Sequence, residues 1–265
     1  MLQNLLHRFS IGIKIIRLFK NWYKMTIYFS EDKNISPILE LRKGLKFYTN
    51  NNLLDVVAIV ENFGFENEHD YFKMTNILKK SCIIDIGANI GAFSIYTATR
   101  FPDAEIFSYE PDPKNFEKFI KNIELNKIKN ISPHNQAVGK IKGNVNLYSD
   151  NKGNFGTVGS SLVNTGPKYL VISCVTLDDI LKDNHIEKCD FLKIDCEGGE
   201  YDIIFNSNKD TFMRIKSITL EYHDIVNHQL NELESFLKNM GYHITKIPNK
   251  RNPKFGLIYA KLENT

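Results

Sequence analysis

The apolar and polar positions follow different patterns on either side of residue 80. From Cys82 onward, short apolar runs alternate with amphipathic segments, which is typical of a parallel sheet whose strands are joined by crossover helices. The pattern predicts strands at 82–85, 105–109, 131–138, 190–195 and 216–222. It predicts helices at 92–100, 114–126, 176–181, 200–205 and 230–240. The fold class is therefore α/β, with helices on both faces of a mostly parallel sheet.

The end of the chain departs from this alternation. Segments 242–247 and 255–262 read as strands, and the short connection between them contains two prolines. A hairpin of this kind would place one antiparallel strand at the edge of the sheet. Two further strands, 143–149 and 169–175, flank the glycine-rich polar segment 150–162. That segment can be interpreted either as a lid over a site or as a surface loop.

Residues 1–79 read as an N-terminal extension that covers a second domain at 80–265. A hairpin is expected at 38–48 and a helix at 53–62. Residues 2–25 mix apolar and basic side chains and contain no apolar run long enough to span a membrane. This basic amphipathic segment has three possible roles: packing on its own protein, contact with an anionic membrane surface, or dimerisation.

Composition narrows the class of protein only moderately. The chain has 265 residues, of which 42% are hydrophobic and 25% charged, so a normal core is expected. A net charge of +3 is too small to indicate a nucleic-acid partner. The four cysteines form no C-x-x-C pair and lie in apolar contexts, which indicates free thiols in a reducing compartment. We therefore expect a cytoplasmic protein, with peripheral contact at the inner membrane face if residues 2–25 bind lipid.

The most informative motif follows the first strand of the second domain. Asp85-x-Gly87-x-Asn89-x-Gly91 leads into a helix, and a strand, a glycine turn and a helix N-terminus together form a nucleotide-binding corner. The order differs from the dinucleotide fingerprint G-x-G-x-x-G. A carboxylate before the turn would repel a pyrophosphate but not the cationic S-adenosylmethionine. The alternative is a tight turn that binds no ligand.

The next strand ends in Glu110, 25 residues after Asp85. A carboxylate at this place can accept hydrogen bonds from both ribose hydroxyls of a nucleoside. Asn135 and Ala137 end the following strand, where an adenine ring would rest. These residues favour an adenosine-containing cofactor without indicating a reaction.

A third group of polar residues follows the strand at 190–195. Lys193, Asp195 and Glu197 gather at its carboxyl end, and His223 ends the next strand. Open α/β sheets bind ligands at such strand ends, and a carboxylate or an imidazole there can act as a general base. No histidine pair indicates a metal site, and a carboxylate-held Mg²⁺ or Ca²⁺ is possible but not implied.

Taken in order, these segments resemble the FkbM-type family of S-adenosylmethionine-dependent methyltransferases over about residues 80–225. The resemblance is carried by 84–91, 109–111, Asn122-x-x-x-Asn126, 176–178, 192–200 and 221–223. Cys196 departs from it, since such proteins often carry valine there. The resemblance implies a class I methyltransferase fold and O-methylation, often of sugar or polyketide hydroxyls. It also implies cofactor contacts at Asp85, Gly87, Ala88, Asn89, Gly91, Glu110, Pro111 and Asp195.

Two other functions share part of this pattern. An NAD-binding oxidoreductase would use the same corner and the same ribose carboxylate, but Asp85 and the missing third glycine argue against it. A non-catalytic adenosine-binding domain would not need the acidic residues around Asp195. For a methyltransferase, the candidate bases are Asp195, Glu197 and His223, and Lys193 would pair with an acid or orient a substrate oxygen. The acceptor, a small molecule or a glycan, is not identified by the sequence.

Overall fold

The computed structural model describes residues 12–24, 38–49, 53–63, 71–73, 75, 77–78, 80–149, 162, 167–196, 198–223, 230–249 and 252–263. Of His223 it describes the backbone alone. Glu197 and most of the expected 150–162 loop therefore lie outside the described residues.

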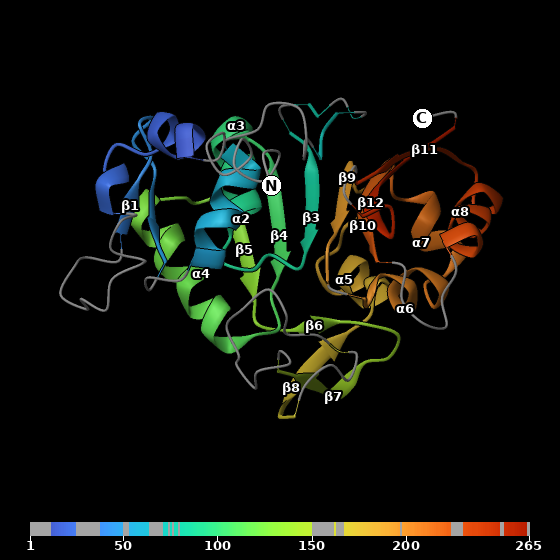
Figure 1. The fold of residues 1–265 in the computed structure, drawn as a ribbon. Helices are drawn as coiled ribbons and strands as arrows, with labels where there is room; N and C mark the ends of the chain where they lie inside the picture. The colour runs from blue at the N-terminus through green and yellow to red at the C-terminus, as the bar shows by residue number, and fades with distance from the viewer. Residues whose placement is uncertain are drawn as a thin grey trace.

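A seven-stranded sheet forms the centre of the molecule, in the order β11-β12-β10-β9-β3-β4-β5 (Figure 1). Its parallel strands are β3 (Cys82–Ile86), β4 (Glu105–Tyr109), β5 (Ile131–His134), β9 (Phe191–Ile194) and β10 (Ser217–His223). The mostly parallel sheet expected from the sequence is thus confirmed. β3 lies at the switch point of the topology, because the chain continues to β4 on one side and later returns to β9 on the other.

The antiparallel strand lies one position further in than expected. β12 (Phe255–Leu262) pairs antiparallel with both β10 and β11 (Tyr242–Pro248), so that β11 is the edge strand. The hairpin between β11 and β12 was predicted correctly. The edge strand β11 does pair antiparallel with its neighbour, but the strand that runs against the rest of the sheet is β12, because β12 pairs with β10 along seven residues and lies between its hairpin partner and the sheet.

Helices cover both faces of the sheet. α3 (Ala92–Arg100) and α4 (Pro113–Asn126) follow β3 and β4, and α5 (Leu177–Asp183) precedes β9. α6 (Glu200–Phe205), α7 (Lys209–Met213) and α8 (Leu230–Asn239) lie near β10 and the closing hairpin (Figure 1). Helix starts follow from local chemistry: Asp112 caps α4 ahead of a proline, and Thr176 forms a capping box with Asp179 at α5.

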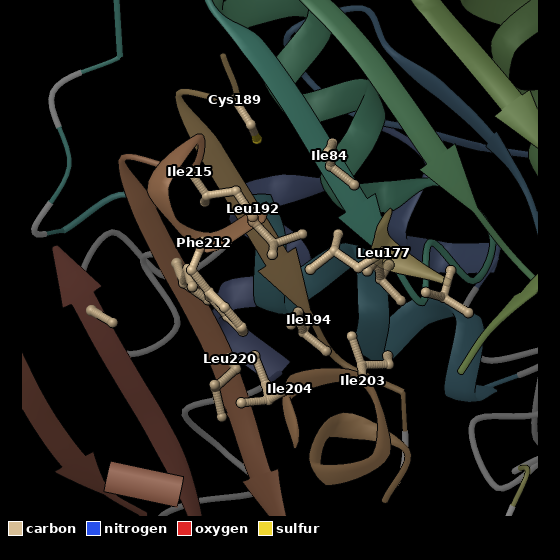
Figure 2. Packing of buried hydrophobic residues seen from close by; sticks show 14 of the residues in the cluster. Ile84, Leu177, Cys189, Leu192, Ile194, Ile203, Ile204, Phe212, Ile215 and Leu220 are labelled. Carbon is tan, nitrogen blue, oxygen red and sulfur yellow. The ribbon is translucent and has the colours of Figure 1, made fainter. Parts of the chain in front are cut away.

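Alternation along the strands separates two apolar clusters, one on each face. Ile84 and Ile86 pack on one face with residues of α5, α6 and α7, and Figure 2 shows side chains of this cluster, with Leu220 and Ile204 beside each other. Ile83 packs on the other face with Phe93 of α3 and Phe191. Asp85 and Lys193 have the same parity as Ile83 and Phe191, so they share this second face.

The expected strand at 131–138 is two strands. β5 ends at His134, and β6 (Ala137–Val138) belongs to a separate sheet of order β6-β8-β7, with β7 (Gly143–Tyr148) and β8 (Tyr169–Val175). This sheet lies below the arrowheads of β3, β4 and β5 in Figure 1. The chain divides at Asn135, whose side-chain amide donates to the backbone oxygens of Glu110 and Pro111.

The N-terminal extension packs against the domain. β1 (Ile38–Glu40) and β2 (Lys46–Tyr48) form the expected hairpin, and α2 (Leu53–Phe63) is the expected helix. A short helix at 12–18 precedes the fully buried Phe19, which pairs with Leu41 of the hairpin. One apolar cluster joins Phe19, Phe47 and Ile59 to Ile90 and Ile95 of the α3 region. Within the described parts of the chain, no helix combines the length and the apolarity needed to cross a bilayer.

Candidate active site

The loop from Gly87 to Gly91 joins β3 to α3 at the carboxyl edge of the sheet. Gly87, Asn89 and Gly91 all have positive φ angles, of 80°, 52° and 82°. The backbone N–H groups of Gly87 and Ala88 both donate to the Tyr109 oxygen at 3.0 Å. The loop is therefore bound to the end of β4 and has a fixed shape.

The two glycines also permit close packing of the protein on itself. A Cβ at Gly87 would lie 1.7 Å from the backbone oxygen of Asp195, and one at Gly91 would lie 2.0 Å from the ring of Phe119. From the sequence we expected these glycines to admit a ligand. The structure gives them a further role, because they let β9 and α4 approach the loop.

Glu110 is buried beside this loop, with 5% of its surface exposed. One carboxylate oxygen accepts the Asn89 N–H at 2.7 Å, and the other accepts the Asp112 N–H at 2.9 Å. Burial raises the pKa of Glu110 to about 8, although these backbone donors and the Lys193 ammonium oppose the rise. Each oxygen of a carboxylate has a second lone pair, so Glu110 can still accept from a ligand.

Asp85 and Lys193 form a buried ion pair beneath the loop. Lys193 Nζ lies 3.0 Å from Asp85 Oδ1 and donates to the Gly87 oxygen at 3.0 Å, while Ser94 Oγ donates to Asp85 Oδ2 at 2.5 Å. The side chains are 3% and 0% exposed. Burial opposes the charge of Lys193, but Asp85 and then Asp195 raise its pKa above the usual value. Lys193 therefore stays protonated and cannot serve as a base.

The neutralised Asp85 changes one argument made from the sequence. We took Asp85 as a free negative charge that would repel a pyrophosphate, but its carboxylate is compensated by Lys193 within the fold. The choice between an S-adenosylmethionine site and a dinucleotide site cannot depend on that repulsion. The expected contact between Asp85 and the cofactor stays a prediction.

Asp195 lies directly after β9 at the same edge, and its side chain is 26% exposed. Its Oδ2 accepts a hydrogen bond from the Tyr71 hydroxyl at 3.2 Å and lies 3.5 Å from Lys193 Nζ. Both contacts recorded among the described residues involve Oδ2, and none involves Oδ1. Asp195 thus has one anchored oxygen and one oxygen available for a substrate.

Two further acidic side chains lie near Asp195: Glu61, which was not singled out from the sequence, and Glu221, which belongs to the 221–223 segment of the family resemblance. Glu61 of α2 is largely buried, and burial followed by the charge of Asp195 raises its pKa to about 7. Glu221 of β10 shares the sheet face of Lys193, and its charge contributes to the raised pKa of Tyr71. No local motif marks Glu61 or Tyr71, because both approach Asp195 only through the tertiary fold. Glu197 and the His223 side chain, two of the expected bases, are outside the described residues.

The residues that surround the loop suit an adenosine-containing cofactor. Asn89 Oδ1 is buried without a hydrogen-bond partner in the described structure, next to the carboxylate of Glu110. A buried acceptor without a donor is costly, and a polar group of a ligand would satisfy it. Asn135 is exposed beyond Glu110, and Ala137 is buried in β6. No group of three or more potential metal ligands occurs among the residues described.

Comparisons with known proteins indicate the family to which the chain belongs. The sequence model of the family described as "Methyltransferase FkbM domain" matches residues 85–244, more than half of the chain. "Methyltransferase 1" of Beauveria bassiana is 26% identical over 165 residues, covering 54% of this chain and 65% of that protein. "Methyltransferase sdnD" of Sordaria araneosa is 22% identical over 225 residues, covering 73% and 86%. The match thus spans just under two thirds of the first relative.

A solved structure adds a likeness in fold. The methyltransferase FkbM from Methylobacillus flagellatus is similar over 71% of this chain and 45% of that chain, with 16% identity and a TM-score of 0.49. The sequence match over 85–244 is the finding that decides the assignment. This chain belongs to the FkbM family of methyltransferases, which have the class I fold and use S-adenosylmethionine as cofactor.

Proposed function

We propose that this protein transfers a methyl group from S-adenosylmethionine to a hydroxyl group of a sugar, a glycolipid or a small metabolite. Family membership supports methyl transfer, and the hydroxyl acceptor is our inference from the resemblance and from the acidic site. The observation that carries the proposal is the paired placement of Glu110 and Asp195 around the Gly87–Gly91 loop. Glu110 supplies a buried acceptor for a ribose, and Asp195 supplies an accessible one for the substrate.

The cofactor supplies an activated methyl group on a sulfonium. In our proposal Glu110, Asn89 and the loop hold the adenosine, with Asn135 and Ala137 near the base. Asp195 Oδ1 would hydrogen-bond the acceptor hydroxyl and take its proton, so that the oxygen could accept the methyl group that the bound cofactor would supply. Lys193 holds Asp85 and the loop, and its charge is fixed by that pair. Glu197 and His223 are alternative bases.

Calorimetric titration tests the cofactor site. Wild-type protein should bind S-adenosylmethionine and S-adenosylhomocysteine with micromolar affinity and should not bind NAD. Glu110→Gln should weaken both by about tenfold or more, which corresponds to losing ~1.4 kcal/mol of binding. The matched Glu117→Gln variant changes an exposed glutamate on α4 and should bind normally. Binding of NAD alone would overturn the proposal in favour of a dehydrogenase.

Radiolabelled methyl transfer onto a panel of neutral sugars, glycolipids and small hydroxylated metabolites tests the chemistry. Asp195→Asn should lower kcat by about 10²-fold to 10⁴-fold, the usual contribution of a general base, while S-adenosylhomocysteine still binds. Glu197→Gln and His223→Gln should be measured in the same assay. The base is the residue whose replacement lowers kcat most while S-adenosylhomocysteine still binds. Transfer to an amine or a carbon in place of a hydroxyl would contradict the O-methylation part of the proposal.

We also propose a peripheral membrane contact through the N-terminal segment. Ile13 and Ile16 lie on the outer face of the 12–18 helix with 38% and 42% of their surfaces exposed, and Trp22 is similarly exposed. Arg17 and Lys20 lie exposed beside them. Exposed aliphatic groups, an aromatic side chain and cations in one segment suit an anionic lipid surface.

A further inference from the structure

Tyr71 reaches the candidate site from outside the family-matched region. It precedes residue 85, where the match begins, and belongs to the N-terminal extension. Its side chain is 7% exposed, and its hydroxyl donates to Asp195 Oδ2 at 3.2 Å across 124 residues of sequence. The extension therefore contacts the residue that we propose as the base.

The position of Tyr71 is fixed by contacts that do not involve its hydroxyl. Its backbone oxygen accepts a hydrogen bond from Thr219 Oγ1 at 2.9 Å, and Thr219 is fully buried in β10. Its ring packs edge-on against Phe93 with centroids 5.2 Å apart, and the Lys193 ammonium lies 5.5 Å from the ring centroid. A phenylalanine at this position would keep all of these contacts and lose only the bond to Asp195.

Charges around Tyr71 keep its hydroxyl a donor. Burial, and then the negative charges of Asp195, Glu221 and Glu61, raise the pKa of Tyr71 well above its usual value. A neutral phenol next to a carboxylate donates its proton in the hydrogen bond. Lys193 approaches the same oxygen at 3.5 Å, so Tyr71 and Lys193 both hold one oxygen of the Asp195 carboxylate.

We propose that Tyr71 is a positioning residue, which holds Oδ2 of Asp195 so that Oδ1 is presented to the acceptor hydroxyl. The inference rests on the proposed role of Asp195. It makes the N-terminal extension a functional part of the methyltransferase, because the domain at 80–265 alone would lack this donor. Among the described elements, Lys193 of β9 and Glu61 of α2 interact with Asp195 through their charges, and Glu221 of β10 acts on Tyr71 and Lys193 beside it.

Tyr71→Phe is the test, with Tyr96→Phe as its matched control. Tyr96 on α3 contacts the side chain of Arg100 through its hydroxyl at the surface, away from Asp195. Tyr71→Phe should lower kcat by about tenfold, because the Asp195 carboxylate loses the donor that holds Oδ2 while the tyrosine ring contacts are kept. The affinity for S-adenosylhomocysteine and the unfolding temperature should match those of Tyr96→Phe.

A second readout separates this inference from the proposed function. Carboxyl-labelled aspartate allows the Asp195 carboxyl resonance to be observed by NMR at one fixed pH, with its assignment taken from the signal that Asp195→Asn removes. The chemical shift of this carboxyl should change in Tyr71→Phe, which removes a direct hydrogen-bond donor, and stay at the wild-type value in Tyr96→Phe, even if no acceptor has been found. Equal carboxyl shifts and equal kcat in the two variants would overturn the positioning role. A changed carboxyl shift without methyl transfer onto any acceptor would instead count against the proposed function.

Discussion

Glu110 combines near-complete burial with an ionisable group. Its pKa of about 8 in the folded protein, against 4.5 as the ordinary value, results mainly from burial. Because the pKa is higher in the folded protein than in the unfolded chain, protonation of Glu110 stabilises the fold. This contribution to the free energy of unfolding is fully present below pH 4.5 and is lost as the pH rises toward about 8. At pH 7 the loss amounts to about 3 kcal/mol. Ionisation of the Glu110 carboxyl in the site therefore lowers the free energy of unfolding.

Replacement of Glu110 by glutamine should remove this pH dependence. We expect urea unfolding of Glu110→Gln to give a free energy that changes less between pH 5 and about pH 8 than that of the wild type. Near pH 5 the variant should be less stable by about 1 kcal/mol, because an amide accepts through only one oxygen and Asn89 or Asp112 loses its acceptor. Glu117→Gln, at an exposed position, is the control. Parallel curves for wild type and Glu110→Gln would mean that Glu110 is ionised in the fold.

The loop between β3 and α3 is the element on which both halves of the site depend. Gly87 contacts the backbone of Asp195, and Asn89 donates to Glu110, so one short segment fixes the spacing between the cofactor residue and the proposed base. Gly44 in the β1–β2 hairpin has a similar positive φ of 91°, but a Cβ there would meet no atom within 4 Å. Substitutions at Gly44 and Gly87 therefore distinguish the cost of backbone strain alone from the added cost of a clash in close packing.

Gly87→Ala should be far more damaging than Gly44→Ala. Gly44→Ala forces an alanine into the left-handed region and should cost about 1–2 kcal/mol in unfolding free energy, with normal cofactor binding. Gly87→Ala adds a clash with a backbone oxygen that no side-chain rotation relieves. We expect it to unfold at much lower denaturant and to lose S-adenosylhomocysteine binding in calorimetry. Similar losses in the two variants would contradict the packing role of Gly87.

The sequence predicted those elements whose cause is local. The strand–glycine–helix corner, the helix that begins near Thr176 and the hairpin at 38–48 follow from nearby residues, and the structure contains all three. The division of 131–138 was missed, because the pairing of Ala137 and Val138 with β8 depends on residues much further along the chain. The inserted position of β12 and the approach of Tyr71 to Asp195 depend on partners far along the chain. Such contacts leave no periodic signal in one sequence.

At the scale of the whole molecule, positive charge is concentrated in two segments of the extension. The described segments 12–24 and 38–49 contain seven lysines and arginines and one acid, whereas the whole chain has a net charge of only +3. The rest of the chain, which includes the other residues of the extension, is therefore net negative. A protein with this asymmetry should approach an anionic surface with these two segments first. The aliphatic residues Ile13 and Ile16 favour lipid over nucleic acid, because they gain by burial in a bilayer interface.

Trp22, the only tryptophan in the chain, is a direct probe of this contact. Its fluorescence should shift to the blue on addition of vesicles that contain phosphatidylserine and should not shift with phosphatidylcholine alone, because the cations need anionic lipid. Ile16→Ser and Arg17→Glu should each weaken the effect, and salt should weaken it further by screening. Val57→Ser removes an equally exposed apolar side chain on α2 and should bind like the wild type.

A shift in Trp22 fluorescence that depends on protein concentration without lipid would indicate dimerisation through this segment. A shift with RNA but not with vesicles would indicate a nucleic-acid surface. Either result would overturn the membrane contact, whereas a lipid-specific shift would mean that the extension has two separate roles: attachment through residues 12–24 and support of Asp195 through Tyr71.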